Sequence, residues 1–140
     1  MGIPSLSILI HEILKLLQHA GCDPSEVTFF RMGTSGGLGF DAGTVVISEA
    51  AVDGILRSYM EIPTLGMIIQ HPATLDQTLN KELMEIASEI DVSADMGKTM
   101  CTYDFYEGQA RLDGAFCDYS EEDKLAFLKR AYERGVRNIE

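Results

Sequence analysis

The sequence predicts an α/β protein, because helical patterns alternate along it with short apolar runs typical of buried strands. Leu6, Leu9, Ile13 and Leu17 recur at helical spacing near the start, whereas residues 44–47 are an uninterrupted β-branched run. Ligands of such folds bind beyond the carboxyl ends of the strands, and glycine-containing polar loops follow two of the predicted strands. With 140 residues, the chain is expected to form one domain, 1–140.

The first and the last predicted helix have local signals at both ends. Pro4 favours a helix start and Gly21 a helix stop, while Ser120 can cap the last helix and Gly135 suits the position after it. Residues 59–69 are predicted to be an irregular edge strand or a loop, because a proline and a glycine interrupt them. The predicted helices are residues 5–20, 76–90 and 121–134, and the predicted strands are residues 27–32, 44–47, 96–102 and 136–139.

The charge balance excludes several partners. The chain has 11 Lys and Arg against 22 Asp and Glu, a net charge of −11, which argues against nucleic acid and against an anionic membrane surface. His11 and His19 lack the spacing that brings two metal ligands together, so no metal site is expected. Three cysteines without a Cys-x-x-Cys motif fit a reduced cytoplasmic protein, in which Cys101 and Cys117 are expected to be buried thiols.

The segment 31–39 has the composition of an anion-binding turn. It follows a predicted strand and contains four glycines, which let the backbone approach a ligand closely. Successive backbone N–H groups in such a turn bind anions, and Arg31 adds a permanent, fork-shaped charge. The segment has neither the dinucleotide fingerprint nor the Gly-Lys-Ser/Thr of a P-loop. The alternative is a glycine turn at a strand end, with Arg31 in an ordinary salt bridge.

The segment 101–113 combines aromatic residues with Gln109 and Arg111 around a glycine. The glutamine amide both accepts and donates hydrogen bonds, whereas the arginine offers donors only. Together they suit a cyclic imide edge, such as that of uracil, which presents an acceptor, a donor and a second acceptor in a row. The alternative is that both residues are solvated loop residues, as most polar loop residues are.

The two segments together resemble the animal-type uridine phosphorylases of the nucleoside phosphorylase family. The Phe-Tyr-Glu-Gly-Gln-x-Arg string of residues 105–111 is the most specific match. The matching residues are 2–5, 31–37, 43–47, 104–114 and 137–140. The resemblance implies part of a three-layer α/β/α sandwich with a mixed central sheet. It also implies that residues 1–140 are a partial domain, lacking the family's N-terminal and C-terminal parts.

The resemblance assigns a role to each candidate residue. Arg31 would clamp the phosphate charge, Thr34 would bridge phosphate and ribose, and Arg111 would donate to a carbonyl of the base, so these three are the catalytic candidates. The implied phosphate site is Arg31, Met32, Gly33 and Thr34, and the implied nucleoside site is Thr34, Ser35, Gly36, Phe105, Gln109 and Arg111. Inorganic phosphate would be a co-substrate and no cofactor is expected. A homo-oligomer is expected, with a dimer favoured.

Three functions follow from these observations. The first is phosphorolysis of uridine to uracil and ribose 1-phosphate, in pyrimidine salvage. The second is a non-catalytic, truncated fragment that binds nucleosides or associates with full-length subunits. The third is a related enzyme that acts on another nucleoside. Phosphate-dependent turnover separates the first from the second, and base selectivity separates the first from the third.

Overall fold

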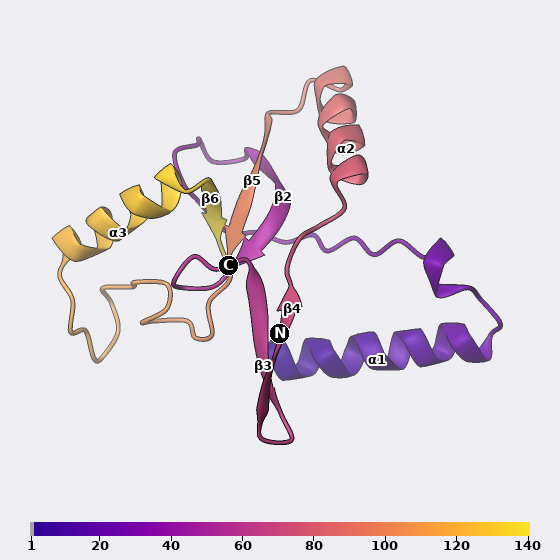
Figure 1. Ribbon diagram of the computed structural model, residues 1–140. Coiled ribbons are helices and arrows are strands. Elements are labelled where there is room, and N and C mark those ends of the chain that lie inside the picture. The colour runs from indigo at the N-terminus through magenta and orange to yellow at the C-terminus, as the bar shows by residue number, and fades with distance from the viewer. Residues whose placement is uncertain (1) are drawn as a thin grey trace. The chain divides into compact units, whose positions relative to one another are not determined.

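The computed structural model describes residues 2–140 and divides the chain into two compact units, one ending at Gly33 and one running from Thr34 to Glu140 (Figure 1). Each unit is described by itself. That residues 1–140 form one domain therefore stays a prediction. Within residues 2–140, none of the helices is both long and apolar enough to cross a membrane.

The first unit consists of the helix α1 (Ile3–His19) and the short 3-10 helix η1 (Pro24–Glu26). The predicted first helix is confirmed, beginning two residues earlier and ending one residue earlier than expected. None of the residues of α1 is buried, although its apolar side chains recur at helical spacing. The strand predicted at 27–32 is wrong. These residues form no strand, since a strand requires a hydrogen-bonded neighbour and they pair with none in the described part of the chain.

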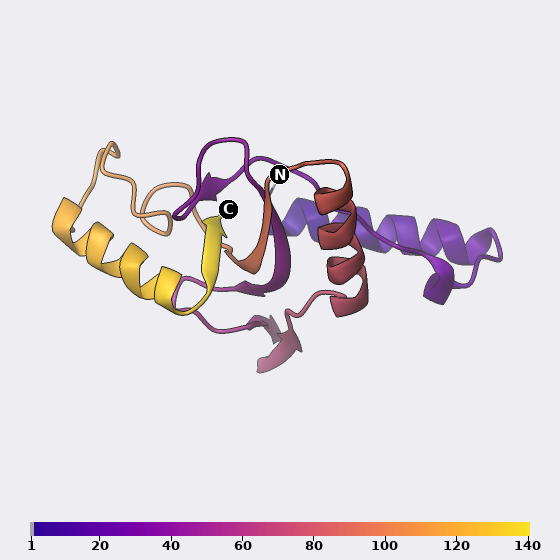
Figure 2. The same cartoon turned by 90° about the horizontal axis from the view of Figure 1, so that it is seen from above.

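The second unit is built on a four-stranded sheet in the order β1 (Gly36–Gly37), β6 (Val136–Ile139), β5 (Ala94–Met100), β2 (Val45–Val52). The strands β2, β5 and β6 are parallel, and β1 pairs antiparallel with β6. The sheet is therefore mixed, which confirms this feature of the predicted α/β fold. In Figure 2 the strands lie between α2 (Gln77–Glu89) and α3 (Glu121–Glu133), which pack beside β2 and β6 respectively.

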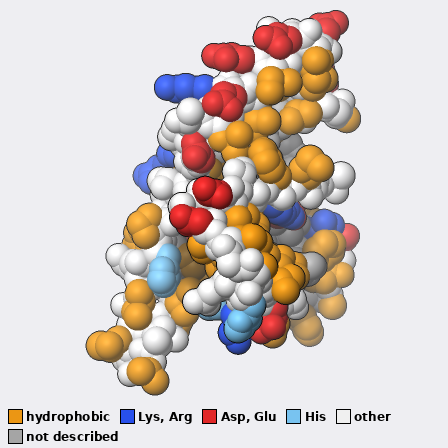
Figure 3. Space-filling view, turned by 90° about the vertical axis from the view of Figure 1, so that its right-hand side faces the viewer, with side chains coloured by type: hydrophobic (Ala, Val, Ile, Leu, Met, Phe, Trp, Pro, Cys, Tyr) orange, Lys and Arg blue, Asp and Glu red, His pale blue; other side chains and the backbone are white. Residues whose placement is uncertain are grey.

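Both predicted helices of the second unit are confirmed; α3 begins at the predicted residue, and α2 begins one residue later than expected. The Asp76 carboxylate accepts hydrogen bonds from two first-turn N–H groups of α2, and Ser120 forms a capping box with Asp123 on α3. The hydroxyl and the N–H of Ser120 hold the pKa of the Asp123 carboxyl below its usual value. In the upper part of Figure 3, where α2 lies, acidic side chains stand beside hydrophobic ones. Ile86 of α2 and Ile90, the residue that follows this helix, are both exposed.

The core of the second unit lies between the sheet and α3. Val52, Met100, Ala131 and Val136 form its centre, and Leu38, Leu56, Phe127 and Ile139 pack around them. The side chain of Met100 is completely buried, at the end of the central strand β5. Burial at strand ends fixes the backbone from which the following loops leave, so the core supports the loop that begins at Cys101.

Residues 59–72 form a regular hairpin of β3 (Tyr59–Thr64) and β4 (Met67–Pro72), which corrects the irregular edge or loop expected from the sequence (Figure 1). The two turn residues, Leu65 and Gly66, both have positive φ, of 50° and 82°. A two-residue turn of this kind matches the twist of paired strands, and Gly66 adopts it without strain. Pro63 is tolerated because the hairpin has only two strands, so both of its strands are edges.

Candidate functional site

The loop that follows β5 is organised around the carboxylate of Asp104. It accepts hydrogen bonds from the backbone N–H groups of Tyr106, at 2.8 Å, and Gly108, at 2.9 Å. The Thr102 hydroxyl donates to the Asp104 carbonyl at 2.8 Å. A Cβ at position 108 would lie 2.8 Å from the Asp104 carboxylate, so this close approach requires glycine. The loop is therefore a folded turn with its own hydrogen bonds.

This turn brings three predicted nucleoside residues together. The guanidinium carbon of Arg111 lies 3.8 Å from the centroid of the Phe105 ring, a cation–π contact. The Arg111 Nε–H donates to Gln109 Oε1 at 3.4 Å. Both polar side chains are half-buried. A planar guanidinium and a planar amide, supported by an aromatic face, offer several donors and an acceptor to a flat polar ring.

The second predicted segment lies at the same edge of the sheet. Gly36 pairs with Ile139 of β6, and the neighbouring Ser35 accepts a hydrogen bond from the Asn138 side-chain amide at 2.7 Å. The carboxyl end of β6 adjoins that of β5, and Thr102 N–H donates to the Glu140 carbonyl at 3.0 Å. Ser35, Gly36 and the loop after β5 thus share the strand-end edge where α/β proteins bind ligands.

The predicted phosphate residues divide between the two units. Thr34 is exposed at the start of the second unit. Arg31, Met32 and Gly33 belong to the first, where Met32 is 92% exposed. A Cβ on Gly33 would lie 3.3 Å from the Arg31 guanidinium, so glycine lets this side chain fold over the backbone. The roles of Arg31, Met32, Gly33 and Thr34 stay predictions.

The sequence profile of the phosphorylase superfamily matches residues 1–137. The chain belongs to this superfamily. Its resemblance to animal uridine phosphorylases is also confirmed, since human uridine phosphorylase 2 is 52% identical over 141 residues, covering all of this chain and 44% of the relative. A relative from Schistosoma mansoni named inactive uridine phosphorylase B is 42% identical, with coverage of 100% and 47%.

The fold of this phosphorylase superfamily member is also similar to that of a solved uridine phosphorylase structure. Uridine phosphorylase from Schistosoma mansoni, in complex with uracil, superposes with a TM-score of 0.94 at 46% identity. The alignment covers all of this chain and 49% of that one. The predicted nucleoside phosphorylase type of fold is thus confirmed. The chain spans about half the length of the relatives that it matches.

In this superfamily member, the structure shows a further residue that contacts the loop after β5 and that the sequence did not indicate. The Tyr119 hydroxyl donates to the Arg111 carbonyl at 2.6 Å and lies 3.4 Å from the Tyr106 carbonyl. Partial burial, and then the ionisable groups of Cys117 and Glu107, raise the pKa of Tyr119, so its hydroxyl stays protonated and can donate. No local sequence signal points to Tyr119, because it meets the loop only through the tertiary fold.

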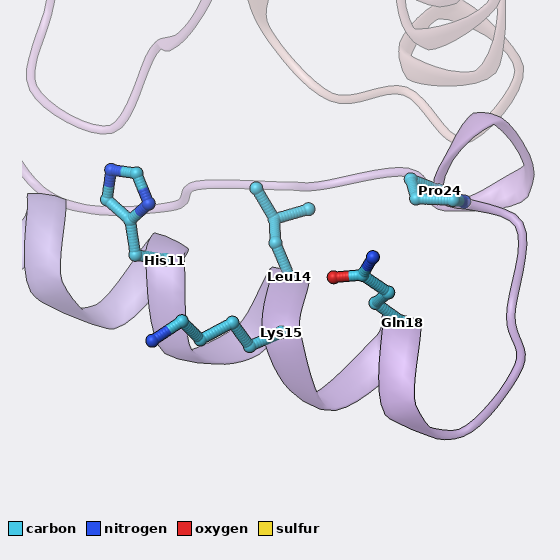
Figure 4. A pocket seen from close by; sticks show the side chains of 5 residues that line it. All are labelled: His11, Leu14, Lys15, Gln18 and Pro24. Carbon is cyan, nitrogen blue, oxygen red and sulfur yellow. The ribbon is translucent and has the colours of Figure 1, made fainter.

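Other chemical features lie apart from these loops. A hollow of about 490 Å³ on the first unit is lined by five residues, and in Figure 4 His11, Leu14 and Gln18 lie along one side of α1 while Lys15 points away. Among residues 2–140, no three His, Cys, Asp or Glu residues are grouped to hold a metal ion. Cys101 and Cys117 are exposed, not buried as expected, because both lie in loops outside the core.

Proposed function

We propose that the protein catalyses the reversible phosphorolysis of uridine to uracil and ribose 1-phosphate, as part of pyrimidine salvage. The observation that carries the proposal is the loop after β5, which holds Arg111 on the face of Phe105 and in a hydrogen bond to Gln109. The named activity of the human relative and the uracil bound to the Schistosoma mansoni structure support the same substrate class.

The proposed reaction forms a bond from a phosphate oxygen to the anomeric carbon while the bond from that carbon to uracil breaks. The bonding electron pair leaves with the base, so positive charge develops on the ribose and negative charge on uracil. A catalyst must stabilise both charges in the transition state more than in the bound substrate. Arg111 and Gln109 would donate hydrogen bonds to the departing base, where the negative charge grows.

The phosphate would bind to Arg31, Met32, Gly33 and Thr34, with Arg31 as its charge partner and Thr34 between phosphate and ribose. An arginine fork suits a phosphate oxygen pair better than a point charge does. Phosphate is then a co-substrate, and the reaction needs no other cofactor. We further propose a homo-oligomer, with a dimer favoured, and a cytoplasmic location, which suits three cysteines without a Cys-x-x-Cys motif.

The deciding experiment measures uracil release from uridine by the purified protein, with and without inorganic phosphate. We expect release that requires phosphate and a preference for uridine over inosine, with thymidine and deoxyuridine as further substrates to compare. Hydrolysis independent of phosphate would contradict the proposal. Binding of uracil without any turnover would favour the non-catalytic role, and it would place the protein beside its relative that is named inactive.

Tyr119 is expected to support this activity by holding the base-binding loop. Tyr119→Phe keeps the ring and removes the bond to the Arg111 carbonyl, so kcat/KM for uridine should fall roughly 10-fold through misplacement of Arg111. Tyr103→Phe is the matched control, because within residues 2–140 the Tyr103 hydroxyl reaches only the Met60 sulfur, at 4.0 Å. Equal kcat/KM values for the two variants would show that the Tyr119 hydroxyl does not position the loop.

A further inference from the structure

Four polar side chains form a continuous hydrogen-bonded chain across the sheet of the second unit. The Ser48 hydroxyl on β2 lies 2.5 Å from the Thr99 hydroxyl on β5, and the Thr99 hydroxyl donates to Asn138 Oδ1 on β6 at 2.7 Å. The Asn138 Nδ2–H group donates to the Ser35 hydroxyl at 2.7 Å. Thr99 and Asn138 are each only 8% exposed, whereas Ser35 is exposed at the candidate site.

The orientation of the Asn138 amide, together with donor and acceptor counting, gives this chain one direction. A hydroxyl has one hydrogen, and an amide oxygen can only accept, so the Thr99 hydrogen is used in the bond to Asn138. Ser48 must then donate to Thr99. The amide nitrogen of Asn138 can only donate, so Ser35 accepts from it. The hydrogen of the Ser35 hydroxyl is left to point away from the sheet.

The start of the chain is anchored from α2. Asn80, which is 4% exposed, donates from its side chain to the Ser48 carbonyl at 3.0 Å. This bond holds β2 where its register with β5 shifts, between Ser48 and Ala50. Among the described residues, no buried side-chain nitrogen or oxygen lacks a hydrogen-bond partner. Reversing one bond alone would leave a buried group unpaired, so the bonds of the chain share one direction.

We propose that Asn138 is a positioning residue that makes the Ser35 hydroxyl a hydrogen-bond donor to an acceptor oxygen of the bound substrate. The inference rests on the proposed function. It adds Asn138 as a positioning residue and specifies that the Ser35 hydroxyl donates its hydrogen bond. Because the two hydrogen-bonding groups of Asn138 face opposite neighbours, Ser35 cannot satisfy itself by donating back into the sheet. In the bound state, an oxygen of phosphate or of the nucleoside would accept the outward-pointing hydrogen of the exposed Ser35 hydroxyl in place of water.

The test is a double-mutant cycle with Ser35→Ala and Asn138→Asp. An aspartate at 138 still accepts from Thr99 but can only accept from Ser35, so the serine hydrogen turns inward. Each single change should lower kcat/KM roughly 10-fold to 100-fold, and the double variant should match Ser35→Ala within about 3-fold. The KM that rises in Ser35→Ala, for phosphate or for uridine, identifies which substrate carries the acceptor.

Thr99→Ser is the conservative control, because it keeps the hydroxyl and should keep activity within about 3-fold. Losses that multiply in the double variant, or a Ser35→Ala variant with unchanged kcat/KM, would overturn the proposal. If Asn138→Asp does not fold, Asn138→Ala in both Ser35 backgrounds tests whether Asn138 acts through Ser35, because alanine removes the bond that positions the serine hydroxyl. Losses that multiply in that double variant would overturn the proposal.

A separate measurement keeps this inference distinct from the proposed function. The side-chain amide protons of Asn138 can be followed by NMR in the unmodified protein and in Ser35→Ala. If the protein does not release uracil, the proposed function fails, yet a shifted Asn138 amide signal in Ser35→Ala supports the directed chain. An Asn138 signal that does not change would overturn the chain itself, whatever the activity.

Discussion

Replacing Gln109 by alanine is expected to lower kcat/KM for uridine by roughly 10-fold to 1000-fold, which is the cost of leaving a polar base edge without its partner. The amide is half-buried, and its oxygen accepts from Arg111, so its position is fixed before a ligand arrives. The loss should be smaller for inosine, whose base presents a different edge. Steady-state kinetics with both nucleosides therefore give the result as a ratio.

The matched control for this prediction is Gln18→Ala, an exposed glutamine on α1. It should leave kcat/KM for uridine unchanged, because Gln18 lies outside both predicted segments. A Gln109→Ala variant with an unchanged uridine-to-inosine ratio would show that this amide does not read the base. Such a result would leave phosphorolysis itself standing and would move the choice of base to other residues.

The sequence predicts the residues of the candidate site better than the residues that hold them in place. Gln109 and Arg111 are two residues apart in the sequence, so their proximity could be predicted without knowledge of the fold. Asp104 was also accessible, because an aspartate shortly before a glycine is a signal for a side-chain-stabilised turn. Tyr119 and Asn138 were not accessible, since each meets its partner only after α3 and the sheet have formed.

The fold shows the same division between local and non-local signals. Helix ends followed their caps, as at Asp76 and Ser120, because a cap acts within one turn. Residues 27–32 have a strand-like composition, yet strand formation depends on a partner that local composition does not specify. The hairpin was not predicted because Pro63 and Gly66 interrupt the run, and because Leu65 adopts a positive φ that sequence rules reserve for glycine or asparagine.

The turn that follows β2 depends on one carboxylate. Asp53 is 7% exposed, and its side chain accepts from the backbone N–H groups of Ile55, at 3.0 Å, and Arg57, at 2.9 Å. The Arg57 Nε–H group donates to Asp53 Oδ2 at 2.7 Å, and the Nη2 atom of the same guanidinium lies 3.2 Å from Glu61 Oε2. The carboxylate therefore links the end of the sheet to the base of the hairpin.

Asp53→Asn is expected to lower the free energy of unfolding by about 2–3 kcal/mol, because a buried charge-assisted bond is lost while its donors stay in place. About a third of the Arg57 side chain is exposed, so water partly replaces the lost carboxylate and limits the decrease in unfolding free energy. Urea unfolding of the two proteins measures the difference. Asp118→Asn, a change at an exposed aspartate in a loop, is the control and should cost little.

The loss caused by Asp53→Asn should also depend on pH in a definite direction. Burial raises the pKa of the Asp53 carboxyl, but the backbone N–H groups and the guanidinium of Arg57 lower it more, so the net pKa lies below its usual value. A lowered pKa in the folded state stabilises the fold above the usual carboxyl pKa of about 4, and this contribution disappears as pH falls through the folded value. The difference in unfolding free energy should stay constant between about pH 7 and 5 and shrink below about pH 4. A difference that grows on acidification would mean that Asp53 is not held as a carboxylate by Arg57.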